Sequence, residues 1–124
     1  MIHISNGVDL IEIERVAQAI ERHGERFLTL VFTPQELDEL KGNSASLAGR
    51  FAAMEAVAKA LGTGIGLIAW QEIEILRGPA REPLLFLHGA AAELAAQKHL
   101  TEWTVSLSHT ETLAVAAVFA VGES

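Results

Sequence analysis

One long predicted helix is the feature that most constrains this chain. Residues 44–64 read SASLAGRFAAMEAVAKALGTG, with a serine start signal and glycine stop signals. Within this segment the larger apolar side chains recur at helical spacing and form one narrow stripe, made of Leu47, Phe51, Met54, Ala58 and Leu61. We therefore predict a central helix that packs against the core of the fold.

Two charged residues of this segment, Glu55 and Lys59, stand four positions apart at the edge of the stripe. On a solvated helix such a pair is ordinary surface decoration and contributes only about 0.2–0.5 kcal/mol. Beside a core-facing stripe the same acid and base would be partly buried, and they could hold an ion or a phosphate. The helix alone leaves both interpretations open.

The composition predicts a single domain, residues 1–124, with a substantial core, because half of the residues are hydrophobic. No apolar run is long enough to span a membrane, and the start lacks the order of charges and apolar residues typical of a signal peptide. There is no cysteine, which excludes disulfides, thiol catalysis and thiolate zinc sites, and we expect a reducing cytoplasm. Nine basic residues against sixteen acidic ones give a net charge of −7, which argues against nucleic acid as the partner.

The order of the other elements predicts an α+β domain, in which helices pack on one face of an antiparallel sheet. A Thr33–Glu36 capping box with proline at the first helical position starts one short helix. From Trp70 onward, the alternation of Ile73 and Ile75 with Glu72 and Glu74 predicts a half-buried strand. The predicted ranges are a strand at 2–8, helices at about 10–23 and 34–41, strands at 70–76 and 84–88, a helix at 89–99, and strands at 103–107 and 112–121.

The helix predicted from residue 10 to 23 has arginines on one side. Arg15 and Arg22 share a stripe, and Arg26 extends it only if the helix continues past Gly24. This stripe is either a solvated face or a docking strip for an acidic partner.

Four polar groups are candidates for chemistry: Asp9, expected where the first strand gives way to helix; the Glu55 and Lys59 pair; the 62–66 glycine loop; and the 108–110 hairpin tip. Short glycine loops usually only end helices, although some approach phosphates closely. Together the four groups suggest Mg²⁺ with a phosphorylated ligand, because magnesium binds one or two carboxylates and takes its other oxygens from phosphate and water. Serine proteolysis fits poorly, since adjacent strand residues such as Ser108 and His109 point to opposite faces.

The order and spacing of five segments also resemble a known family. The segments are Gly7–Leu10, Phe32–Leu37, Leu47–Gly64, Trp70–Glu74 and Ser106–Thr110. Along nearly its whole length the chain resembles the short bacterial acyl-carrier-protein synthases, which are 4′-phosphopantetheinyl transferases. The resemblance implies the phosphopantetheinyl transferase fold and an enzyme of lipid metabolism, one that moves the phosphopantetheine arm of coenzyme A onto a serine of apo-acyl carrier protein and releases adenosine 3′,5′-bisphosphate.

The resemblance also implies a role for individual residues. Asp9 and Glu55 match the magnesium carboxylates, Lys59 matches a phosphate-contacting lysine, and these three would be the catalytic residues. Arg15, Arg22 and perhaps Arg26 match the face that meets the acidic carrier protein. The expected coenzyme A contacts are Arg50, Lys59, Gly62, Thr63, Gly64, Pro83, Ser108, His109 and Thr110. The family forms homotrimers with sites between subunits, and the acceptor of the serine proton stays open among Asp9, Glu55 and a metal-held water.

Two positions depart from the family pattern. Met54 stands where the family usually has a lysine, which would leave one fewer cation at the site if that lysine reaches a phosphate. Glu82 adds an acid to the turn before Pro83. Met54 motivates the alternative of a non-catalytic or weakened relative that binds coenzyme A or carrier protein, and a purely structural trimer is a third possibility.

Overall fold

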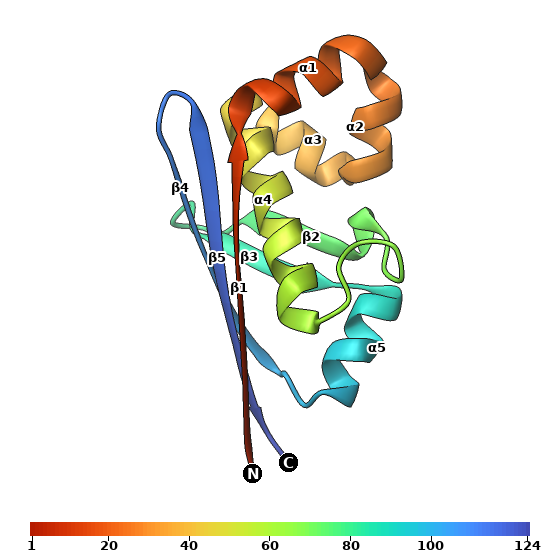
Figure 1. Ribbon diagram of the computed structural model, residues 1–124, viewed down its shortest axis with the longest axis vertical. Coiled ribbons are helices and arrows are strands. Elements are labelled where there is room, and N and C mark those ends of the chain that lie inside the picture. The colour runs from red at the N-terminus through yellow and green to blue at the C-terminus, as the bar shows by residue number, and fades with distance from the viewer.

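The computed structural model covers residues 1–124 and has the predicted α+β class (Figure 1). In chain order the elements are β1 (Ile2–Glu12), α1 (Ile13–His23), α2 (Glu25–Val31), α3 (Pro34–Leu40), α4 (Ser44–Leu61), the 3₁₀ helix η1 (Trp70–Glu72), β2 (Ile73–Arg77), β3 (Pro83–Leu87), α5 (Gly89–Gln97), β4 (Glu102–His109) and β5 (Leu113–Glu123). No helix is both long and apolar enough to cross a lipid bilayer.

The strands form two antiparallel sheets. The larger sheet has the order β1-β5-β4, and β2 pairs with β3 in a separate hairpin. Between β3 and β4 the side chains of Leu85, Leu87 and Trp103 line a cavity. The backbones of these two strands are not paired, and the prediction of a single sheet is corrected in this respect. All five α-helices lie on one side of the larger sheet, as predicted (Figure 1).

The first strand is longer than predicted. It pairs with β5 from Ile2, opposite Glu123, to Glu12, opposite Leu113, so Asp9 lies inside the strand and the helix begins at Ile13 rather than near residue 10. Leu10, expected on the buried side of that helix, is 62 % exposed on the outer face of the sheet. The prediction failed because the spacing of Leu10 and Ile13 fits a helix. Pairing with β5, which is distant in the sequence, instead extends the β-strand through these residues.

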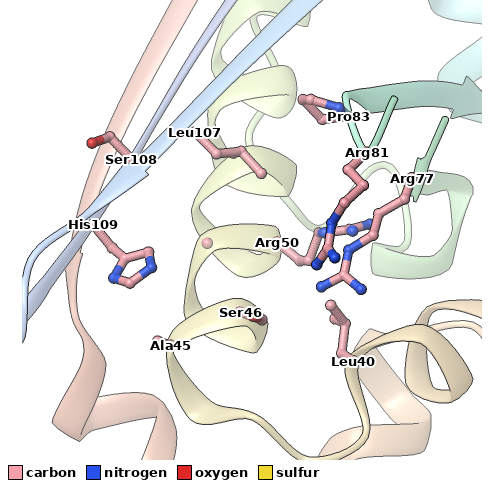
Figure 2. Close-up of a pocket in the computed structure, with 11 residues that line it drawn as sticks. Leu40, Ala45, Ser46, Arg50, Arg77, Arg81, Pro83, Leu107, Ser108 and His109 are labelled. Atoms are coloured by element: carbon pink, nitrogen blue, oxygen red, sulfur yellow. The ribbon is translucent and has the colours of Figure 1, made fainter. Parts of the chain in front are cut away.

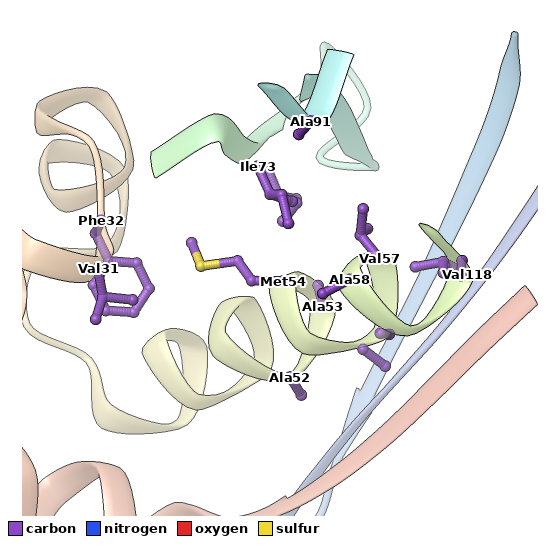
Figure 3. Close-up of a cluster of buried hydrophobic side chains, with 14 of the residues drawn as sticks. Val31, Phe32, Ala52, Ala53, Met54, Val57, Ala58, Ile73, Ala91 and Val118 are labelled. Atoms are coloured by element: carbon purple, nitrogen blue, oxygen red, sulfur yellow. The ribbon is translucent and has the colours of Figure 1, made fainter. Parts of the chain in front are cut away.

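The central helix α4 is buried on almost every side. It begins after Asn43, whose side chain accepts a hydrogen bond from the Ser46 N–H at 3.0 Å, and it ends at Gly62 with φ of 83°. Because α4 contacts both the larger sheet and β2, its buried surface is wider than the predicted apolar stripe. Figure 3 shows Met54 and Val57 directed toward the β2 side, while Val118 comes from the sheet.

Small residues let α4 approach the sheet closely. Its buried positions include alanines at 48, 52, 56 and 60, and β1 contributes Gly7. A Cβ built at Gly7 would lie only 1.9 Å from the carbonyl oxygen of Ala56. The close approach of β1 and α4 places Asp9 next to the helix that bears Glu55 and Lys59.

The capping box at α3 is confirmed. The Thr33 hydroxyl oxygen accepts a hydrogen bond from the Glu36 N–H, and the Thr33 N–H donates to Glu36 Oε1 at 3.0 Å. The prediction for Glu74 was wrong, because this carboxylate is 7 % exposed rather than solvated. It accepts a hydrogen bond from the Thr33 hydroxyl at 2.6 Å and lies 3.0 Å from His88 Nε2. Partners from distant segments therefore bury an acid that the strand pattern alone would expose.

The outer face of the larger sheet has no helix against it (Figure 1), and its β1–β5 part is rich in exposed apolar side chains. The large apolar side chains exposed on it come from β1 and β5, with exposures between 36 % and 63 %, and they are Ile2, Ile4, Val8, Leu10, Leu113 and Phe119, whereas the exposed residues of β4 are mainly polar. A patch of contiguous apolar side chains of this kind is typical of an interface.

Candidate active site

Asp9 and Lys59 form an ion pair between strand and helix. The Lys59 Nζ lies 3.0 Å from Asp9 Oδ1 and also donates a hydrogen bond to the carbonyl oxygen of Val8 at 3.0 Å. The spacing of Glu55 and Lys59 suggested a pair within the helix, but the lysine instead pairs with Asp9 on β1. Lys59 on α4 thus holds Asp9 on β1 in place, and both are predicted catalytic residues.

Glu55 lies beside Asp9 in a cavity of about 470 Å³, which we call the carboxylate cavity. Burial raises the pKa of Glu55, the charge of Asp9 raises it further, and Lys59 acts in the opposite direction. The cavity is lined by Asp9, Leu10, Ile11, Arg15, Val16, Ala19, Phe27, Phe51 and Glu55. Two carboxylates that repel each other in a partly apolar cavity are a favourable place for a cation.

The donor set fits a magnesium ion. The structure contains no group of three or more histidine, cysteine, aspartate or glutamate side chains that could hold a metal by themselves. An ion at Asp9 and Glu55 would therefore need oxygen ligands from a phosphate or from water, which is how proteins usually bind Mg²⁺. The ion would offset the repulsion that raises the pKa of Glu55.

A second cavity of about 240 Å³ gathers three arginines, and we call it the arginine cavity (Figure 2). Figure 2 shows the guanidinium groups of Arg50, Arg77 and Arg81 close together, with His109 directed toward them. The lining residues are Leu40, Ala45, Ser46, Gly49, Arg50, Arg77, Arg81, Pro83, Leu107, Ser108 and His109. In a chain with a net charge of −7, this cavity is a local basic patch suited to an anion.

The arginine cavity brings together four of the residues predicted to contact coenzyme A: Arg50, Pro83, Ser108 and His109. Figure 2 shows the Ser108 hydroxyl turned away from the arginines, so this residue lines the cavity without directing its hydroxyl into it. Arg77, Arg81 and Ser46 were missed by the sequence reasoning. Two arginines within the 77–83 turn were the available signal, but the segment was interpreted only as a turn.

The remaining predicted contacts lie outside both cavities. The N–H groups of Gly62, Thr63 and Gly64 donate to carbonyls of the last turn of α4, at Ala58 and Lys59, so they close the helix. The Thr110 hydroxyl accepts hydrogen bonds from the N–H groups of residues 112 and 113 in the hairpin turn. These four residues have structural roles within the chain, and their contacts with coenzyme A stay predictions.

The predicted docking arginines divide between two helices. Arg15 and Arg22 are exposed on α1, whereas Gly24 ends that helix with φ of 52° and Arg26 belongs to α2. Arg15 also lines the carboxylate cavity. A partner that binds α1 would therefore lie next to Asp9 and Glu55.

Comparison with known proteins identifies the family. Residues 5–118 match the model of the 4′-phosphopantetheinyl transferase superfamily. The chain belongs to this superfamily. The match includes both cavities and the whole of α4.

Three similar proteins share one name, holo-[acyl-carrier-protein] synthase. The chain is 46% identical over 123 residues to the holo-[acyl-carrier-protein] synthase of Herpetosiphon aurantiacus, covering 94% of this chain and 97% of that protein. It is 48% identical over 121 residues to the synthase of Moorella thermoacetica, with 95% and 92% covered. Among solved structures, the holo-[acyl-carrier-protein] synthase of Helicobacter pylori in complex with coenzyme A has a TM-score of 0.85 and 32% identity, covering 93% of this chain and 98% of that one.

The two departures from the phosphopantetheinyl transferase pattern line neither cavity. Met54 is fully buried in the core and lines neither of them. Glu82 closes its own turn, where its side chain accepts a hydrogen bond from the Ala80 N–H at 3.0 Å and its carbonyl oxygen accepts one from the Gly78 N–H. Neither side chain lines a cavity, although Glu82 lies between Arg81 and Pro83, which both line the arginine cavity.

Proposed function

We propose that this protein transfers the 4′-phosphopantetheine arm of coenzyme A to a serine hydroxyl of an apo-acyl carrier protein, in a magnesium-dependent reaction. The observation that supports this best is the convergence of Asp9, Glu55 and Lys59 from β1 and α4. Paired carboxylates beside a lysine match the needs of phosphoryl-group transfer, in which positioning and charge neutralisation provide most of the catalysis. The names of the relatives, holo-[acyl-carrier-protein] synthases, support the same reaction.

The chemistry is a substitution at the phosphorus that bears the pantetheine arm. The serine oxygen forms the new bond to this phosphorus while the pyrophosphate bond breaks and adenosine 3′,5′-bisphosphate departs. Lys59 neutralises charge on the phosphates, and the serine proton passes to Asp9, to Glu55 or to a water beside them. When bound between Asp9 and Glu55, Mg²⁺ would stabilise the negative charge that develops on the departing phosphate.

The acidic carrier protein would dock on α1. Arg15 and Arg22 provide cations there, and Arg15 also faces the carboxylate cavity. A carrier held by these arginines would present its serine at the cavity mouth, next to Asp9. Electrostatic attraction of this kind speeds encounter and fixes orientation. The lack of cysteine supports a cytoplasmic site of action.

We also propose that the protein is a homotrimer with sites between subunits. The apolar outer face of the larger sheet would supply the contact, because Ile4, Leu10 and Phe119 would otherwise remain in water. The carboxylate and arginine cavities share no lining residue within one chain. A coenzyme A molecule that contacts both kinds of cavity could therefore bind the carboxylate cavity of one subunit and the arginine cavity of its neighbour.

Intact-mass spectrometry tests the proposed reaction. Apo-acyl carrier protein is incubated with this protein, coenzyme A and Mg²⁺, and we expect the carrier to gain the mass of one phosphopantetheine group. The gain should disappear when the metal is chelated and return when Mg²⁺ is restored. A complete lack of transfer to several carriers, at high enzyme concentration, would instead favour the alternative of a binding protein without catalysis.

A further inference from the structure

A buried carboxylate lies close to the arginine cavity without lining it. Glu36, at the start of α3, has no exposed surface. Its Oε1 accepts the Thr33 N–H at 3.0 Å and its Oε2 accepts the Ile75 N–H at 3.1 Å, but no lysine, arginine or histidine nitrogen forms an ion pair with it. A fully buried carboxylate without a cation is costly, and such groups often bind a proton.

Arg50 is the corresponding unpaired cation. It is 4 % exposed, it forms no ion pair, and its Nη1 has no hydrogen-bond partner. Its charge acts at longer range on Glu36 and on Glu39, both on α3. Since Arg50 lines the arginine cavity, an anion bound there would provide the partner that its guanidinium group lacks.

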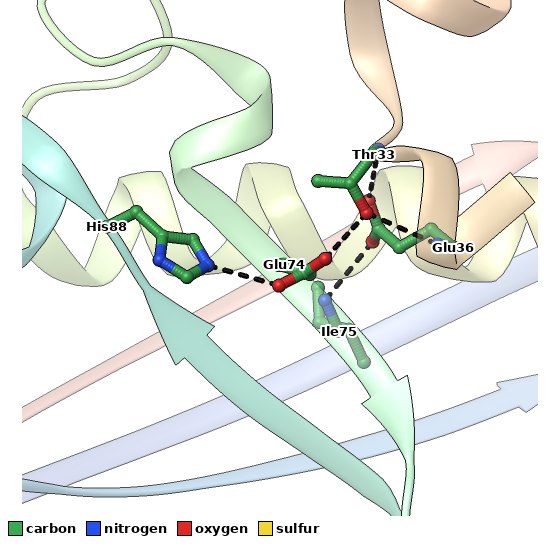
Figure 4. A network of polar contacts seen from close by, with 5 residues as sticks. All are labelled: Thr33, Glu36, Glu74, Ile75 and His88. Atoms are coloured by element: carbon green, nitrogen blue, oxygen red, sulfur yellow. Dashed lines mark hydrogen bonds and ion pairs between the residues drawn. The ribbon is translucent and has the colours of Figure 1, made fainter.

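The charged groups around Glu36 come from every neighbouring element. Arg50 lies on α4, Glu39 on α3, and Glu74 and Arg77 on β2, while His88 before α5 reaches Glu36 only through Glu74 and Thr33 (Figure 4). The pKa of Glu36 is raised to about 7: burial raises it most, two backbone hydrogen bonds and the charge of Arg50 lower it, and the charge of Glu74 raises it least. Arg50 and Arg77 both line the arginine cavity, and of these two Arg50 is the cation whose charge lowers the pKa of Glu36, so an anion bound there would weaken that support.

We propose that Glu36 is a positioning residue of the arginine cavity, and that binding of a phosphate-bearing anion there is coupled through Arg50 to proton uptake by Glu36. This inference rests on the proposed function in taking the anion to be a phosphate of coenzyme A. When the cavity is empty, the field of Arg50 favours the ionised form of Glu36. When a phosphate neutralises Arg50, that support is lost and the Glu36 carboxylate takes a proton from the solvent, so the buried region keeps its charge balance.

The expected proton uptake can be estimated. Loss of a nearby opposite charge raises a carboxyl pKa by about 1–3 units, and the lower limit applies here because no ion pair joins Arg50 to Glu36. With a pKa of about 7 in the free protein, a rise of one unit gives an uptake of about 0.4 protons per site at pH 8. At this pH a phosphate monoester is a dianion, so its own proton change on binding is small.

Isothermal titration calorimetry measures this proton uptake directly. Adenosine 3′,5′-bisphosphate is titrated into the protein at pH 8 in two buffers of different ionisation enthalpy, Tris and HEPPS, without metal. We expect an uptake of about 0.4 protons in the unaltered protein and in the control Glu39→Gln, and almost none in Glu36→Gln. The Kd should weaken by about 0.4 log units per pH unit near pH 8, except in Glu36→Gln.

The outcomes separate the two proposals. Binding with the same proton uptake in Glu36→Gln as in the unaltered protein would overturn the role of Glu36, even if the variant melts at a different temperature. If Glu36→Gln does not fold, a Kd of the unaltered protein that is constant between pH 7 and 9 would overturn it as well. Failure of the bisphosphate and of coenzyme A to bind at all would contradict the proposed function itself.

Discussion

Replacement of Gly7 by alanine tests the contact that builds the site. The added Cβ would lie 1.9 Å from the carbonyl oxygen of Ala56 and 2.9 Å from its carbonyl carbon, and both are backbone atoms that cannot rotate away. Restoring an ordinary contact distance requires β1 and α4 to separate by roughly 1.5 Å. Overpacking of this kind costs about 1–3 kcal/mol, and the rigid backbone on both sides favours the upper limit.

Two consequences of Gly7→Ala can be measured. The free energy of unfolding should fall by about 3 kcal/mol, which for a chain of this size lowers the melting temperature by about 10 °C. Asp9 would also move away from Lys59 and Glu55, and a displacement of about 1 Å can reduce turnover by about 100-fold. Scanning calorimetry checks the first effect, and the rate of phosphopantetheine transfer checks the second.

For the calorimetric measurement Gly49→Ala is the matched control, because a Cβ at this α4 position meets no atom within 4 Å. Within a helix this change should be neutral or should stabilise the protein by up to about 1 kcal/mol. If Gly7→Ala melts at the same temperature as the unaltered protein and transfers at the same rate, the close approach of β1 and α4 does not exist as described.

Three further predictions concern the surface, the core and the docking helix. Ile4→Asp, on the outer face of the sheet, should convert trimers to monomers in size-exclusion chromatography with light scattering, whereas Leu30→Asp, equally exposed on α2, should not; a trimeric Ile4→Asp would refute this interface. Met54→Lys should leave the transfer rate no higher, because residue 54 lies in the core and lines neither cavity, and a tenfold faster variant would show that the site lacks a cation. Arg22→Glu should raise the KM for carrier protein most at low salt and leave coenzyme A binding unchanged, and an effect independent of salt would exclude the electrostatic docking role.

Local signals in the sequence were sufficient for several elements. The capping box at Thr33 and the glycine stop at Gly62 act within a few residues, so the ends of α3 and α4 could be predicted. The change from β1 to α1 could not, since Leu10 satisfies both periodicities and only the partner strand β5 decides between them. Local sequence patterns also do not show which strands pair, and for this reason two sheets were predicted as one.

Some residues of the candidate site could be predicted from the sequence, and others could not. Asp9, Glu55 and Lys59 were predicted from their residue types, their spacing and the family resemblance, and the structure places them together. The roles of Arg77 and Arg81 beside Arg50 could not be predicted, because they depend on the position of the β2–β3 turn against α4. Nor could the burial of Glu36 and Glu74, whose hydrogen-bond partners come from segments far away in the sequence.

The central claim is that Asp9 and Glu55 act together on one metal ion during transfer. The most direct test is a double-mutant cycle of transfer rates at saturating Mg²⁺, with Asp9→Asn, Glu55→Gln and the double variant. If both carboxylates hold the same ion, each single variant loses most of the activity, and the double variant is no slower than the worse single variant within about threefold. If the two losses multiply instead, the carboxylates act independently and the shared site is wrong.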